Sequence, residues 1–118
     1  MASLRTLEPR VRGEAEEFTR LLAQWMKVVV TSARRDRAQQ EKLYRDFVSG
    51  RSKFPAAPPG QSTHGAGTAF DLQLDGISPP KRGPYPWQYE LAGLVWELMG
   101  YTWGGRFDDP IHFDFRPR

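Results

Sequence analysis

The spacing of apolar residues along the chain predicts three helices. Apolar side chains recur at the period of an amphipathic helix in residues 14–26, 36–50 and 87–99. Acidic residues lie in the first turn of the first segment, where they favour the positive end of a helix. Gly50 and Gly100 stand where the second and third segments end, a position that helices commonly give to glycine.

Three further segments have the pattern of strands. Residues 27–32 form a β-branched run, and residues 68–74 and 111–115 alternate apolar with polar side chains, as half-buried strands do. Prolines in residues 51–61 and 75–86 predict loops. Helices and strands therefore alternate along the chain with short links. This order predicts an α+β fold in which helices pack on one side of a small antiparallel sheet.

The length and composition exclude several classes of protein. A chain of 118 residues has room for one core, so we expect a single domain over residues 1–118. Without cysteine there is no disulfide, thiolate metal site or cysteine nucleophile. No apolar run approaches the ~18–20 residues that cross a bilayer. The charged amino-terminal segment has no apolar stretch of the kind found in signal peptides.

The charge of the chain is mildly basic and indicates no particular partner. A net charge of +3 is too small to single out nucleic acid. Binders of single-stranded nucleic acid combine basic grooves with aromatic side chains that stack on bases, whereas Trp25, Trp87 and Trp96 occupy core positions of the predicted helices. We therefore expect no nucleic-acid partner.

Both histidines lie in unusual local sequences. Small residues surround His64 and leave its imidazole open to close approach by a metal or substrate. In the last predicted strand His112 shares the polar face with Asp114, and Asp71 lies on the polar face of the strand before. If these two faces form one wall, His64, Asp71 and His112 supply two imidazoles and one carboxylate. Catalytic zinc sites use this donor set and keep a fourth position for water.

Each histidine also has a simpler interpretation. A lone histidine beside glycines usually forms a hydrogen bond in a turn, and a lone histidine in a strand is usually structural. The metal interpretation is favoured because the chain has two histidines, each accompanied by aspartate, and no cysteine. The residue pattern alone leaves both interpretations open.

Three blocks of sequence resemble the zinc peptidoglycan peptidases that include VanY-type D-alanyl-D-alanine carboxypeptidases and phage L-alanyl-D-glutamate peptidases. The first block fits the pattern S-x-H-x-x-G-x-A-x-D with Ser62, His64, Gly67, Ala69 and Asp71. The second resembles the closing motif of that family, with Trp103-Gly104-Gly105 followed by Asp109-Pro110-Ile111-His112-Phe113. The third resembles its S-G-Y-R-S segment and Q-x-x-L-Y helix, with Ser32 to Asp36, Gln40 and Leu43-Tyr44.

The resemblance implies a role for each matching residue. His64, Asp71 and His112 take the positions of the zinc ligands. Asp109 takes the place of the general base, with Asp108 as its rival, and Pro110 restricts Asp109 to extended geometry. Arg35 matches the arginine that contacts the substrate or its oxyanion, although Arg34 stands where the family often has an aromatic residue. Substrate contacts are implied for Arg34, Gln40 and Ser62.

The function that the resemblance implies is zinc-dependent hydrolysis of peptidoglycan stem peptides by a monomer. We expect an endolysin-type L-alanyl-D-glutamate endopeptidase that, if phage-encoded, is made in the host cytoplasm and acts on the cell wall after release. A D-alanyl-D-alanine carboxypeptidase or dipeptidase is the alternative within the same class. A non-catalytic zinc-binding module of the related hedgehog fold is the alternative from another class.

Overall fold

The structure is a computed structural model that describes residues 2–33, 37–53 and 67–117. Its α-helices are α1 (Pro9–Leu22), α2 (Arg37–Val48) and α3 (Trp87–Leu98). Its strands are β1 (Val28–Ser32), β2 (Ala69–Leu74), β3 (Tyr101–Trp103) and β4 (His112–Pro117), and the 3-10 helices η1 (Leu4–Thr6) and η2 (Gly104–Phe107) complete the elements.

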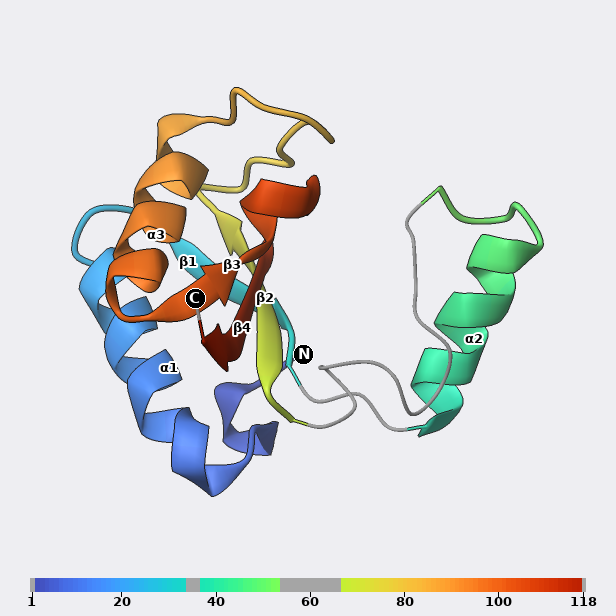
Figure 1. Cartoon of the computed structure of the whole chain (residues 1–118), viewed down its shortest axis with the longest axis horizontal. Helices are drawn as coiled ribbons and strands as arrows, with labels where there is room; N and C mark the ends of the chain where they lie inside the picture. Colours follow the sequence, from blue (N-terminus) through green and yellow to red (C-terminus); the bar gives the residue numbers. More distant parts are fainter. Residues whose placement is uncertain (1, 34–36, 54–66, 118) are drawn as a thin grey trace.

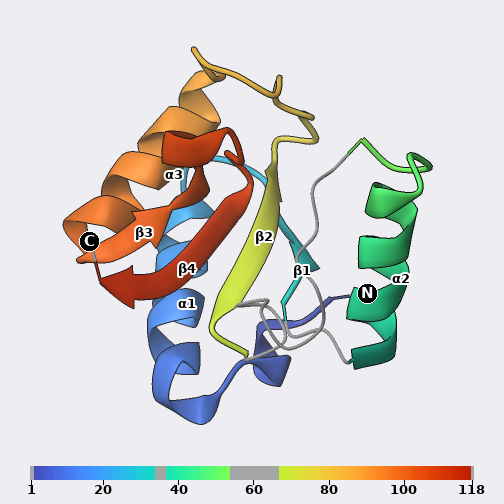
Figure 2. The ribbon, with the colours of Figure 1, turned by 45° about the vertical axis from the view of Figure 1, so that its right-hand side comes forward.

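The four strands form one antiparallel sheet in the order β1-β2-β4-β3. Helices α1 and α3 lie together on one side of this sheet (Figure 1). Helix α2 stands apart from both of them, and a second view shows the same separation (Figure 2). The predicted α+β class is therefore confirmed.

Aromatic side chains fill the space between the sheet and the two helices. Phe70 of β2 stacks on Phe113 of β4 with ring centroids 5.7 Å apart. Phe18 of α1 lies 4.7 Å from Trp96 of α3 and 5.3 Å from Phe113. All four side chains are buried. Because successive side chains of a strand point to opposite faces, the polar neighbours of Phe70 and Phe113 must point away from these helices.

The first helix differs from its predicted bounds at both ends. It begins at Pro9, because proline is tolerated in the first turn where its missing N–H has no partner to lose. It ends at Leu22, and Trp25 in the turn that follows is 67% exposed. Trp87, in the first turn of α3, is 57% exposed. The expectation that Trp25 and Trp87 are core residues is wrong, and only the third expected tryptophan, Trp96, is buried.

Within the described residues no helix has the length and apolar character needed to span a bilayer.

Candidate metal centre

Asp71 and His112 lie opposite each other on neighbouring strands. They are Cα partners in the antiparallel pairing of β2 with β4. The Leu72 N–H donates to the Ile111 carbonyl at 3.0 Å, so the adjacent Asp71–His112 pair takes the position without backbone hydrogen bonds. Side chains approach most closely at such positions. The register of the sheet therefore brings these two polar side chains together, on the face away from the aromatic core.

The distance between the two side chains suits a shared metal ion. His112 Nδ1 lies 3.5 Å from Asp71 Oδ1, and both side chains are largely buried. Two donors that each lie 2.0–2.2 Å from a tetrahedral zinc ion are about 3.3–3.5 Å apart. Imidazole nitrogen and carboxylate oxygen are also the ligand types that zinc prefers. The two residues fit zinc in both spacing and chemistry.

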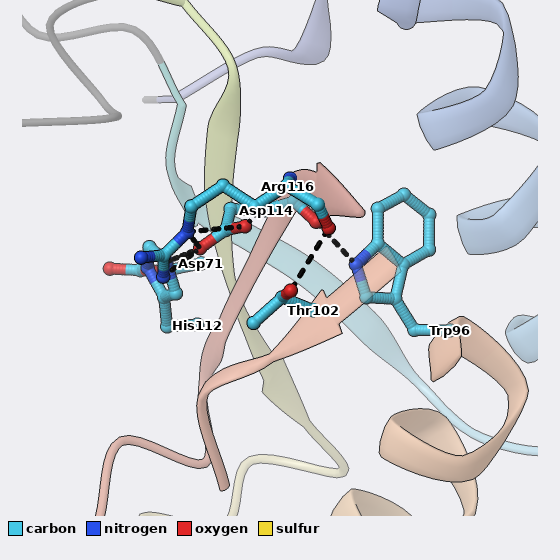
Figure 3. Close-up of polar contacts among 6 residues, drawn as sticks. All are labelled: Asp71, Trp96, Thr102, His112, Asp114 and Arg116. Carbon is cyan, nitrogen blue, oxygen red and sulfur yellow. Dashed lines mark hydrogen bonds and ion pairs between the residues drawn. The ribbon is translucent and has the colours of Figure 1, made fainter. Parts of the chain in front are cut away.

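The other ring nitrogen of His112 is held by a buried carboxylate. His112 Nε2 lies 2.8 Å from Asp114 Oδ2, and Asp114 is fully buried. The Arg116 guanidinium donates to the same carboxylate through Nη2 at 2.6 Å and through Nε at 3.0 Å. Figure 3 shows this group together with Asp71. The His112 ring is therefore bordered by a carboxylate at each of its two nitrogens.

These carboxylates favour positive charge at the imidazole. Burial alone lowers the pKa of His112, but hydrogen bonds to Asp114 and Asp71 and the negative charges of Asp71 and Asp109 outweigh it and raise the pKa to about 9. Burial raises the pKa of Asp114, and the opposing hydrogen bonds from His112 and Arg116 bring it to about 2. The site is thus built to stabilise a cation, which can be a proton or a metal ion.

In the segment before β4 the two candidate bases, Asp108 and Asp109, have different environments. Asp108 ends η2 in the left-handed region with φ 63°, and its half-exposed side chain lies 3.7 Å from Arg82. Asp109 is held at both backbone groups, because its N–H donates to the Gly104 carbonyl at 2.9 Å and its carbonyl accepts from the His112 N–H at 3.1 Å. The chain therefore makes a tight turn from Asp109 to His112. Of the two carboxylates, Asp109 is the one that acts on the pKa of His112.

A tryptophan supports this turn from behind. The Trp103 indole Nε1 donates to the Pro110 carbonyl at 2.8 Å. Its ring lies against two glycines, since a Cβ would come within 2.1 Å of the ring at Gly93 and within 2.3 Å at Gly105. The Trp103-Gly104-Gly105 motif therefore serves to pack a large ring beneath the turn that bears Asp109 and His112.

A comparison with known families identifies the family of the chain. The family model described as D-alanyl-D-alanine carboxypeptidase matches residues 56–115, just over half of the sequence. The chain belongs to the D-alanyl-D-alanine carboxypeptidase family. The matched range contains Asp71, His112 and the turn between η2 and β4. A search of curated proteins finds no match.

Solved structures share the fold of this family member at low sequence identity. The vancomycin-resistance D,D-pentapeptidase VanY, determined with Zn(II), is 17% identical with a TM-score of 0.69, over 92% of this chain and 72% of that one. The D,D-dipeptidase VanXYg, determined with a D-Ala-D-Ala phosphinate analogue, is 18% identical with a TM-score of 0.69, over 94% and 51%. The Serratia marcescens L-Ala D-Glu endopeptidase ChiX is 21% identical with a TM-score of 0.60, over 96% and 83%.

The structure of this D-alanyl-D-alanine carboxypeptidase family member places only some of the residues expected at the site. It brings Asp71 and His112 together and sets Asp109 in the adjoining turn. Among the described residues no group of three or more histidine, cysteine or acidic side chains is arranged to hold a metal ion. The remaining expected residues lie outside the described residues, namely Arg34, Arg35, Ser62, His64 and the side chain of Gln40. Most of the expected loop of residues 51–61 also lies outside them.

Sequence reasoning missed the parts played by Asp114 and Arg116. Asp114 was placed on the polar face with His112, but its complete burial and its pairing with Arg116 were not expected. The signal available was the alternation of His112, Asp114 and Arg116 along β4, which puts all three on one face.

Proposed function

We propose that this chain is a zinc-dependent peptidase of peptidoglycan stem peptides, and specifically an endolysin-type L-alanyl-D-glutamate endopeptidase. Membership of the D-alanyl-D-alanine carboxypeptidase family supports a peptidase. The observation that carries the metal dependence is the Asp71–His112 pair, whose donor atoms lie 3.5 Å apart on neighbouring strands. Burying two polar side chains costs free energy, and a cation shared between Asp71 and His112 would offset that cost.

Three residues would hold the metal in this proposal. Asp71 and His112 supply one oxygen and one nitrogen, and His64 supplies the third donor by its place in the sequence pattern. Zinc held there would supply Lewis acidity, and with it a nucleophile from water at neutral pH.

The chain itself supplies the proton transfers. Asp109 would accept the proton of the attacking water and return it to the leaving amine, because its turn holds it beside His112. Asp108 is turned toward Arg82 and is exposed over half of its side chain, so it does not compete for this role. Arg35 would stabilise the negative charge that develops on the carbonyl oxygen.

Two observations bear on which bond is cleaved. ChiX, an L-Ala D-Glu endopeptidase, is matched over 83% of its own length, which supports the endopeptidase assignment. The family description and the likeness to VanY and VanXYg favour the second candidate, a D-alanyl-D-alanine carboxypeptidase or dipeptidase.

Digestion of purified peptidoglycan separates these candidates. The zinc-loaded protein should release fragments that mass spectrometry identifies as cleaved between L-alanine and D-glutamate. Release of D-alanine from intact stem peptides would replace this assignment with the carboxypeptidase. Zinc binding without any released fragment would instead support a non-catalytic module and contradict the enzymatic proposal.

Metal analysis tests the ligands. We expect one zinc ion per chain in protein purified without added metal, and its loss in the double variant His64→Ala/His112→Ala. Glu97→Gln is the control, because it replaces a buried ionisable side chain outside the proposed site, a carboxylate that is paired with Arg106 at 2.7 Å. An unchanged zinc content in the double variant would refute the proposed ligand set.

A further inference from the structure

Within the part of the chain that the structure describes, the Asp114 carboxylate contacts two side chains, those of Arg116 and His112. Its Oδ1 accepts the Arg116 backbone N–H at 2.9 Å and the guanidinium Nε at 3.0 Å. Its Oδ2 accepts Arg116 Nη2 at 2.6 Å and lies 2.8 Å from His112 Nε2. A carboxylate that meets a guanidinium through both oxygens is ionised and can only accept hydrogen bonds. The proton shared with His112 therefore belongs to Nε2.

This assignment determines what the other ring nitrogen can do. A neutral imidazole carries one proton, and the hydrogen bond at one nitrogen decides which nitrogen is left with a lone pair. With the proton on Nε2, the lone pair is on Nδ1, and Nδ1 is the nitrogen that faces Asp71 Oδ1 at 3.5 Å. In the neutral ring the Nδ1 lone pair is thus directed toward Asp71, the other described donor of the proposed metal site.

Asp114 is itself held from several sides. Its backbone carbonyl accepts the Trp96 indole N–H at 2.9 Å from the core side of the sheet (Figure 3). Its Cα partner on β2 is Ala69, whose small side chain leaves room for the carboxylate and the arginine. The Arg116 guanidinium rests over the Phe107 ring at 5.7 Å. These contacts are all made by the protein itself, and together they fix the position of the carboxylate.

We propose that Asp114 is a positioning residue of the metal centre, which fixes the orientation and tautomer of His112 so that Nδ1 binds the metal beside Asp71. The inference rests on the proposed function in one respect, namely that zinc is the metal bound. Loss of a carboxylate that orients a metal-bound histidine typically weakens metal binding 10- to 100-fold.

Nuclear magnetic resonance of the zinc-loaded wild-type protein tests the tautomer without any substitution. The chain has two histidines, so their ring nitrogen signals can be assigned individually. We expect the His112 proton on Nε2 and the metal-induced shift on Nδ1. A proton on Nδ1, with zinc on Nε2, would overturn the inference even if zinc is bound stoichiometrically.

Zinc competition titrations against a chelator test the role. We expect about 10- to 100-fold weaker zinc binding in Asp114→Asn, because an amide cannot accept hydrogen bonds at both positions. Glu97→Gln, which also unpairs an arginine from a buried carboxylate, should retain wild-type affinity even where the two variants lose similar thermal stability.

The outcomes separate this inference from the proposed function. Wild-type affinity in Asp114→Asn would overturn the positioning role and leave the zinc peptidase intact. A wild-type protein that binds no zinc would overturn both. Should Asp114→Asn fail to fold, the tautomer of the wild-type protein decides.

Discussion

Gly93 of α3 offers a quantitative test of how the turn beside the metal centre is supported. A Cβ at this position would lie 2.1 Å from Trp103 Cδ2 and within 2.5 Å of two further ring atoms. Carbon atoms in contact are about 3.5–4.0 Å apart, so in Gly93→Ala the ring must retreat by about 1.4 Å or more. That movement acts directly on the indole N–H, which lies 2.8 Å from the Pro110 carbonyl.

The expected loss of stability follows from three contributions. Overpacking of a buried site costs about 1–3 kcal/mol. A weakened hydrogen bond to Pro110 adds about 1 kcal/mol. The better helix propensity of alanine returns about 1 kcal/mol. We therefore expect Gly93→Ala to lower the free energy of unfolding by about 1–3 kcal/mol.

Urea denaturation of a matched pair of variants measures this effect. Gly13 also lies inside a helix, α1, but a Cβ there would have no heavy atom within 4 Å. Gly13→Ala should therefore raise the free energy of unfolding by about 0.5–1 kcal/mol. If Gly93→Ala proves as stable as wild type, or gains stability as Gly13→Ala does, the packing of Trp103 does not constrain this helix and the reasoning is refuted.

Two further predictions concern carboxylates. Asp109→Asn should retain zinc and lower peptidase turnover by about 10²–10⁴, whereas Asp108→Asn should change it little; loss of turnover in Asp108→Asn alone would move the base by one residue. The backbone N–H of Lys27 and the side chain of Gln88 lower the pKa of Asp75 from its ordinary 3.8. A lowered folded-state pKa contributes stability that is present above pH 3.8 and is lost as the pH falls through the folded-state value. In Asp75→Asn the melting temperature should therefore depend less on pH below about 4. If the pH dependence of the melting temperature in acid is the same as in the wild type, this role of Asp75 is contradicted.

Local pattern was sufficient for most elements of the fold. The alternation in residues 68–74 matches β2 at Ala69–Leu74, and the amphipathic period of residues 87–99 matches α3 at Trp87–Leu98. Such periods depend only on which side chains share a face, so they can be recognised without knowing what the face contacts. Strand β3, Tyr101–Trp103, was not recognised, because three residues are too few to show alternation.

Long-range packing decided the rest. The sequence by itself placed Asp71, His112 and Asp114 on polar strand faces and named Asp71 and His112 as candidate ligands. Only the pairing of β2 with β4 placed the two donors 3.5 Å apart, and only the folded structure buried Asp114 against Arg116. The turn before β4 likewise depends on contacts with Gly104 and Trp103. This turn places Asp108 near Arg82 and Asp109 beside His112. Burial and strand register arise from segments far apart in the chain, so no local pattern could determine which carboxylates surround His112.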